Sequence, residues 1–187
     1  MSHPFESISP HRLHTAFWLL AATTAILLTV EGTIYVKLTN PVAPLGILSL
    51  ELAATPDRLN QVVGSWAEGP KSGMIFSLGL NFLCLFALTN AVAVACVIAA
   101  KRLNGPFSRL GSLLAWAQWL AGAVWAVQNS LLAWGVFGHA SWSTTALSAS
   151  LSIAKFTIVG MGVLYAVTAA LLGLARPRPL TARQATR

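Results

Sequence analysis

Charged residues are scarce in this chain. Only 9% of its 187 residues are Asp, Glu, Lys or Arg, whereas 56% are hydrophobic. Soluble domains carry about 25% charged residues. The composition therefore excludes an ordinary soluble domain and predicts an integral membrane protein.

Cysteine is nearly absent, and its two copies are not placed for redox chemistry. Cys84 and Cys96 fall in one predicted helix, where their spacing separates them by roughly 18 Å at the helical rise. They cannot pair with each other. Without a C-x-x-C motif, a disulfide-exchange enzyme is disfavoured. Both cysteines are expected to be small packing residues.

Catalytic and cofactor motifs are also missing. The sequence has no P-loop and no G-x-G-x-x-G. Haem between membrane helices needs facing histidines, but His3, His11 and His14 precede or begin the first apolar run and His139 follows the third. Ser152–Lys155 matches S-x-x-K, yet the S-D-N and K-T-G partners of that motif are absent. We therefore expect no enzymatic activity, no cofactor and no metal site.

Four apolar runs exceed the roughly 20 residues that cross a bilayer as a helix. They predict an all-α integral membrane protein, a four-transmembrane-helix bundle with a short amphipathic helix in its first outer loop. The predicted segments are an N-terminal segment 1–12, a bundle 13–175 and a basic tail 176–187. Within the bundle the spans are about 13–38, 74–100, 110–137 and 147–175, and the outer loop is 39–73.

Lys and Arg are distributed unequally between the two sides of this bundle. Eight of the 12 flank the spans on one side: Arg12, Lys101, Arg102, Arg109, Arg176, Arg178, Arg183 and Arg187. Cytoplasmic loops carry the excess of Lys and Arg, so both termini are expected in the cytoplasm. The Ala-, Arg- and Leu-rich composition fits a high-GC bacterium, and the expected location is a bacterial inner membrane. The net charge of +7 reflects this asymmetry, and no nucleic-acid partner is expected.

The outer loop contains an amphipathic helix signal. Thr55 is a suitable N-cap and Pro56 a suitable first helical residue. One helical face then carries Leu59, Val62, Val63 and Trp66. Three interpretations remain open: this helix lies in the outer headgroup layer, covers the open end of the bundle, or docks another protein.

Polar residues recur at one depth in the predicted spans. Each span places such a residue about seven or eight positions, or roughly 10 Å, from its outer end. The residues of this layer are Glu31, Asn81, Gln128, Asn129 and Lys155. Intramembrane charges are costly and are functional candidates by default. The layer is either a buried Glu31–Lys155 ion pair with supporting amides, or a small polar chamber.

These features predict a non-enzymatic accessory or assembly subunit that packs against other membrane proteins through its 39–73 loop. Asn90, about 180° around its helix from Asn81, favours contact with another subunit. The expected partners are the lipid bilayer and other membrane proteins, or a second copy of the chain. The alternative is a small transporter or amphiphile-binding protein that uses the Glu31/Lys155 layer. An enzyme acting at the outer leaflet is a third and weaker interpretation.

Overall fold

The computed structural model describes residues 3–175, and every regular element in this range is helical. The four long helices are α1 (Pro10–Leu38), α4 (Glu68–Ala100), α5 (Pro106–Trp134) and α6 (Trp142–Ala175). All four are long and apolar enough to cross a membrane. The predicted all-helical class with four long apolar helices is therefore confirmed. The basic tail 176–187 lies outside the described residues.

The long helices begin three to six residues before the predicted spans. Pro10 and Pro106 stand in the first turns of α1 and α5, where a missing N–H costs nothing. Glu68 lies in the first turn of α4, where a carboxylate favours the helix dipole. Hydropathy predicts where each apolar run lies. The proline or acidic residue in the first turn explains why the helix begins several residues before that run.

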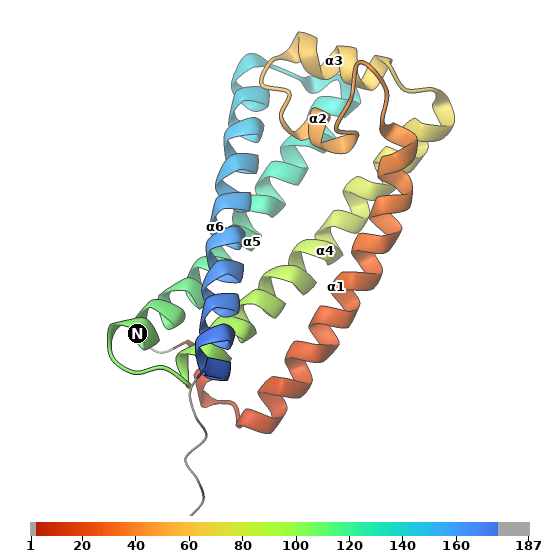
Figure 1. Cartoon of the computed structure of the whole chain (residues 1–187). Helices are drawn as coiled ribbons and strands as arrows, with labels where there is room; N and C mark the ends of the chain where they lie inside the picture. Colours follow the sequence, from red (N-terminus) through yellow and green to blue (C-terminus); the bar gives the residue numbers. More distant parts are fainter. Residues whose placement is uncertain (1–2, 176–187) are drawn as a thin grey trace, which may run out of the picture.

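Helix α4 is the centre of the bundle. It packs against α1, α5 and α6, while α1 and α6 make little contact with each other. Figure 1 shows α1 and α6 running along opposite sides of the bundle. A Cβ on Gly162 of α6 would lie 2.7 Å from Val92 Cγ1 of α4, and one on Gly111 of α5 would lie 2.8 Å from Ala100 Cβ. Small residues thus allow close helix contact, as is usual in membrane bundles.

Two short helices, α2 (Ile47–Glu51) and α3 (Pro56–Gly64), lie across one end of the bundle (Figure 1). We call α2 and α3 the cap, and we call this end of the bundle the cap end. The cap covers an apolar core that includes Leu38, Ile47, Leu50, Leu59, Val62, Trp66, Met74, Leu78 and Leu132. Thr55 Oγ1 accepts a hydrogen bond from Arg58 N at 3.1 Å and so caps α3.

The chain reverses direction at Gly46, which lets α2 turn back into the bundle. Gly46 has φ +55°, a conformation that glycine adopts without the steric cost of a side chain. A Cβ there would also lie 3.1 Å from the Tyr35 carbonyl oxygen. Asn40 holds the preceding turn, because its Oδ1 accepts hydrogen bonds from the backbone N–H groups of Val42 and Ala43.

The opposite end carries the N-terminal segment, a short 3-10 helix η1 (Pro4–Ser7) and the connection between α4 and α5. The His3 ring is buried against Trp116 and Trp119, with ring centroids 4.9 and 4.7 Å away. Burial lowers the pKa of His3 below its ordinary value. Lys101 Nζ donates to the Ile8 carbonyl at 2.9 Å and ties this segment to the bundle.

Candidate functional site

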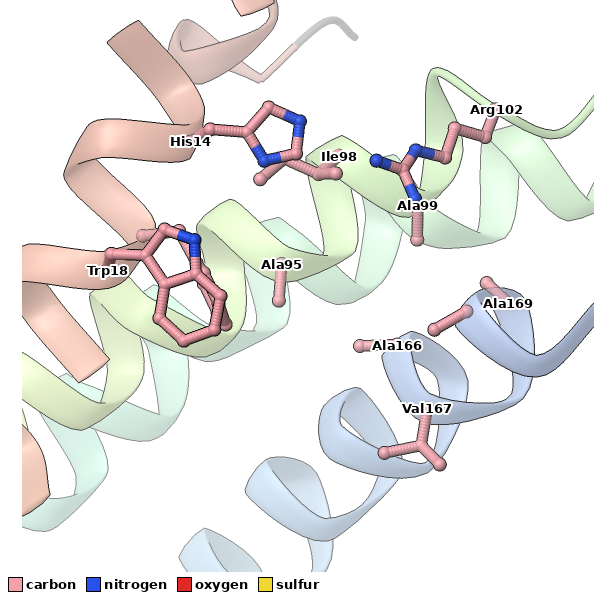
Figure 2. Close-up of a pocket in the computed structure, with 11 residues that line it drawn as sticks. His14, Trp18, Ala95, Ile98, Ala99, Arg102, Ala166, Val167 and Ala169 are labelled. Carbon is pink, nitrogen blue, oxygen red and sulfur yellow. The ribbon is translucent and has the colours of Figure 1, made fainter. Parts of the chain in front are cut away.

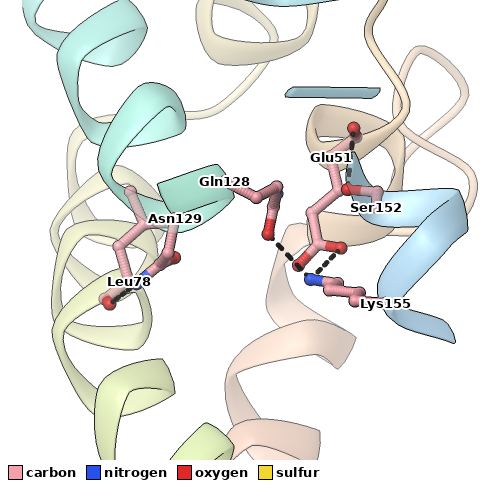
Figure 3. Close-up of polar contacts among 6 residues, drawn as sticks. All are labelled: Glu51, Leu78, Gln128, Asn129, Ser152 and Lys155. Carbon is pink, nitrogen blue, oxygen red and sulfur yellow. Dashed lines mark hydrogen bonds and ion pairs between the residues drawn. The ribbon is translucent and has the colours of Figure 1, made fainter. Parts of the chain in front are cut away.

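The most polar buried region lies directly beneath the cap. Lys155 of α6 is 1% exposed, and its Nζ lies 2.9 Å from Glu51 Oε2. The same ammonium donates a hydrogen bond to Gln128 Oε1 of α5 at 2.8 Å. It also lies 4.5 Å from the ring centroid of Trp125, within cation–π range. Figure 3 shows Gln128, Glu51 and Lys155 converging from three different elements.

The carboxylate partner of Lys155 is Glu51, so the proposed Glu31–Lys155 pair is wrong. Glu51 falls within the predicted outer loop 39–73, but the residue is 3% exposed. The reversal at Gly46 explains the difference, because it turns the C-terminal end of α2 inward. The local clue is that Glu51 sits among leucines, with Leu50 and Leu52 on either side.

Helix α6 also holds this part of the cap through its hydroxyl groups. Ser152 Oγ donates to the Glu51 carbonyl at 3.3 Å, and Thr145 Oγ1 donates to the Ala54 carbonyl at 3.2 Å. Ser148, between them on the same face, is buried. One polar face of α6 therefore fixes α2 and the start of the following turn. The sequence spacing of four and three residues between Ser148, Ser152 and Lys155 is the signal that puts all three on one helical face.

Glu31 belongs to a second polar group, between α1 and α4. It is 2% exposed, and Ser77 Oγ donates a hydrogen bond to its Oε2. Asn81 follows Ser77 by one helical turn and is also buried. The i, i+4 spacing of Ser77 and Asn81 is the sequence signal that could have identified Ser77.

Asn129 connects α5 to α4, because its Nδ2 donates to the Leu78 carbonyl at 2.6 Å (Figure 3). All five predicted layer residues are buried. Lys155 and Gln128 share a direct hydrogen bond. Glu31 and Asn81 belong to the polar group between α1 and α4, where Ser77 of α4 donates to Glu31. The layer therefore spans all four long helices and gains Glu51 from α2. Trp125, with its ring against Lys155, lines this region.

The apolar side chains of the predicted amphipathic face pack inside the protein. Leu59, Val62 and Trp66 are buried and Val63 is half-buried. Trp66 Nε1 also donates to the Leu38 carbonyl at the end of α1, at 2.8 Å. Of the three interpretations of this face, the structure agrees with the one that covers the end of the bundle. The same apolar side chains are not open to lipid headgroups or to a docking protein.

The layer offers carboxylates, amides, hydroxyls and one ammonium as binding groups. Within residues 3–175, no three His, Cys, Asp or Glu side chains gather where they could hold a metal ion. Hydrogen bonding, charge and cation–π contact are therefore the interactions that these residues can provide. In comparisons with known proteins, no family model, no curated protein and no solved structure matches this chain.

Proposed function

We propose that this protein spans a bacterial inner membrane with both termini in the cytoplasm, and that it binds a small polar group in the layer beneath its cap. Four long apolar helices support insertion in a bilayer. The excess of Lys and Arg at the end opposite the cap supports a cytoplasmic position for that end. The cap then faces the outer side.

The observation that carries the binding proposal is a set of unmet hydrogen-bonding atoms in this one layer. Six buried side-chain atoms there have no partner among the described residues: Glu31 Oε1, Asn81 Nδ2, Trp125 Nε1, Gln128 Nε2, Asn129 Oδ1 and Ser148 Oγ. Leaving one buried polar atom unsatisfied costs about 1–3 kcal/mol. A bound group that both donates and accepts hydrogen bonds removes that cost.

The charges of the layer indicate which polar group fits. The layer contains two buried carboxylates, Glu31 and Glu51, and one buried ammonium, Lys155, which is already paired with Glu51. Glu31 receives a hydrogen bond from Ser77 but has no cationic partner within residues 3–175. A ligand with a protonated amine or a similar cationic group would pair with Glu31 and keep it ionised, since a buried carboxylate without a cationic partner takes up a proton instead. The proposed ligand is a small cationic solute or the head of a cationic amphiphile.

Native mass spectrometry of the protein, extracted gently from its own membrane, tests this proposal. We expect a small molecule bound in a fixed ratio to wild-type protein and missing from Glu31→Gln. The matched control is Glu68→Gln, which removes an exposed carboxylate paired with Lys71 at 3.1 Å. This control is expected to keep the bound molecule. Wild-type protein that carries no small molecule, or loses it equally in both variants, contradicts the proposal.

A second candidate is the accessory subunit, and the outward face of α3 favours it. Asp57, Asn60 and Gln61 are exposed on that face. Asn90 no longer supports this function, because it accepts a hydrogen bond from Trp119 Nε1 at 3.1 Å and donates to the Phe86 carbonyl. Its polar atoms are therefore satisfied within the chain.

Charge reversal at Asp57 alone tests docking by α3. Arg58 is left unchanged, since its Nη2 donates to the Val42 carbonyl at 2.7 Å and supports the cap. Asp57→Lys is expected to release a stoichiometric protein companion in native mass spectra while the melting temperature falls only slightly, because the first turn of α3 loses one favourable charge. A companion that stays bound argues against docking through this face.

A further inference from the structure

A groove of about 390 Å³ lies between α1, α4 and α6, toward the end opposite the cap. It forms because α1 and α6 both pack on α4 and barely contact each other. Figure 2 shows its alanines on α4 and α6, with His14 and Trp18 on α1. The lining residues are His14, Phe17, Trp18, Ala95, Ile98, Ala99, Arg102, Ala166, Val167, Ala169 and Ala170.

Most of this groove is narrow, apolar surface. Ala95 and Ala99 of α4 and three alanines of α6 contribute only methyl groups. Trp18 stands on the α1 side with 68% of its surface exposed. A lipid acyl chain matches this chemistry, because it offers methylene groups to the alanines and to the indole face. In a bilayer, one bound acyl chain would take the place of the mobile lipid chains that otherwise contact the groove.

The groove ends at a cation. Arg102 lies two residues beyond the last residue of α4, at the level where the chain turns toward α5. Its guanidinium has no hydrogen bond or ion pair with any residue from 3 to 175, whereas the neighbouring Lys101 is engaged by the Ile8 carbonyl. His14 reaches the same region from α1 (Figure 2). A guanidinium binds phosphate oxygens through paired charge-assisted hydrogen bonds.

Two other grooves of similar size provide an internal comparison. One, of about 300 Å³, lies between α5 and α6 around Phe107 and Leu164. The other, of about 280 Å³, lies around Leu13 and Phe86. Neither is lined by a Lys, Arg or His. Only the Arg102 groove, among these three, combines an apolar channel with a cation at its mouth.

We propose that this groove binds one anionic phospholipid, with its phosphate at Arg102 and His14 and an acyl chain along Trp18 and the alanines. The charge complementarity selects an anionic headgroup, and basic pockets between membrane helices on the cytoplasmic side are known to hold such lipids. The proposal rests on the membrane-spanning part of the proposed function. It does not depend on the ligand of the polar layer.

The test uses the full chain in lipid nanodiscs, with phosphatidylglycerol and phosphatidylcholine of identical acyl chains as the two probes. Native mass spectra are expected to show one retained phosphatidylglycerol per chain in preference to phosphatidylcholine. Arg102→Gln is expected to reduce this preference about tenfold. Arg109→Gln is the matched control, because Arg109 is an exposed arginine at the same end outside the groove. It is expected to leave the preference unchanged.

A second variant tests the apolar part of the site. Ala170 is exposed, so Ala170→Leu fills the groove without disturbing the core. It is expected to reduce retention of both lipids. Equal retention of the two lipids by wild-type protein, an equal loss in Arg102→Gln and Arg109→Gln, or full retention in Ala170→Leu would each overturn the proposal. Failure of the chain to insert into nanodiscs at all would instead contradict the membrane-spanning proposal.

Discussion

In the cap end of this bundle each long helix buries a polar side chain, whereas the opposite end packs mainly alanine, valine and leucine. Lys155 and Glu51 meet beneath the cap, together with Gln128. The core near the opposite end is built from Leu13, Val92, Ala93, Val94, Cys96, Val97, Ala99, Leu114, Ala115, Tyr165 and Ala169.

The difference separates two ways of holding helices together. Close packing of small side chains dominates away from the cap, as in many membrane bundles, and only two of the unmet buried polar atoms in residues 3–175, His3 Nε2 and Gln118 Oε1, lie there. The cap end retains buried charges and unmet polar atoms that cost stability. Proteins keep such local violations mainly at functional sites, which is why the binding proposal rests on the cap end.

The largest expected effect comes from breaking the buried pair at the cap end. Lys155→Met leaves the buried Glu51 carboxylate without a cationic partner. This change is expected to destabilise the fold by about 3–5 kcal/mol, measured by thermal unfolding in detergent. Adding Glu51→Gln is expected to recover much of the loss, because the stranded charge is then removed. Adding Glu31→Gln is expected to recover little. Equal rescue by the two second changes would contradict the assignment of Glu51 as the partner.

A packing change at the opposite half is expected to have a smaller effect. Gly162→Ala places a methyl group against Gln118 of α5 and Val92 of α4 and is expected to cost about 1–3 kcal/mol in thermal unfolding. Gly160 is the matched control, since a Cβ there meets nothing within 4 Å. Gly160→Ala should leave stability unchanged or raise it slightly, because alanine is the better helix former. Equal losses of stability in Gly162→Ala and Gly160→Ala would contradict close helix packing at Gly162.

The attachment of the cap to α1 can be weakened without creating a large cavity. Trp66→Phe removes the indole N–H that donates to the Leu38 carbonyl, and is expected to cost about 1 kcal/mol. Trp134→Phe is the control, because Trp134 is 56% exposed. Hydrogen exchange at the backbone of α3 should accelerate in Trp66→Phe alone. Unchanged exchange would mean that this hydrogen bond does not hold the cap.

Sequence reasoning found the parts of this molecule that depend on local pattern. Hydropathy predicted the four long helices, and depth along each helix selected five layer residues that are all buried. It missed Glu51 because the partner of Lys155 is decided by a chain reversal at Gly46, and nothing in the spacing of Glu31 and Lys155 reports that reversal. Helical phase also favoured contact of Asn90 with another subunit, because phase cannot show that Trp119 on the next helix donates a hydrogen bond to it.

The smallest expected effect is a pH response at the end opposite the cap. His3 is buried neutral with a lowered pKa, so its contribution to stability is complete above the ordinary value of 6.5 and is lost as pH falls through the lower folded-state pKa. The pKa of Glu6 is also lowered, with the side-chain hydroxyl of Ser112 as the chief cause, but the stability change linked to Glu6 falls below pH 4.5.

Tryptophan fluorescence reports this response, because Trp116 and Trp119 contact the His3 ring. Between pH 7.5 and 5 we expect a small change in emission as the N-terminal segment loosens. His3→Phe keeps a ring at this position and is expected to abolish the change. A change that persists in His3→Phe would assign the response to another group.

The most direct test of the account is an experimental structure of the protein in its native lipids, at a resolution that shows ordered water. We expect non-protein density beneath the cap, within hydrogen-bonding distance of Glu31 Oε1 and of the unmet amides of Asn81 and Gln128. Lys155 should remain paired with Glu51. A dry layer in which Glu31 pairs with Lys155 and the amides bond to one another would contradict it.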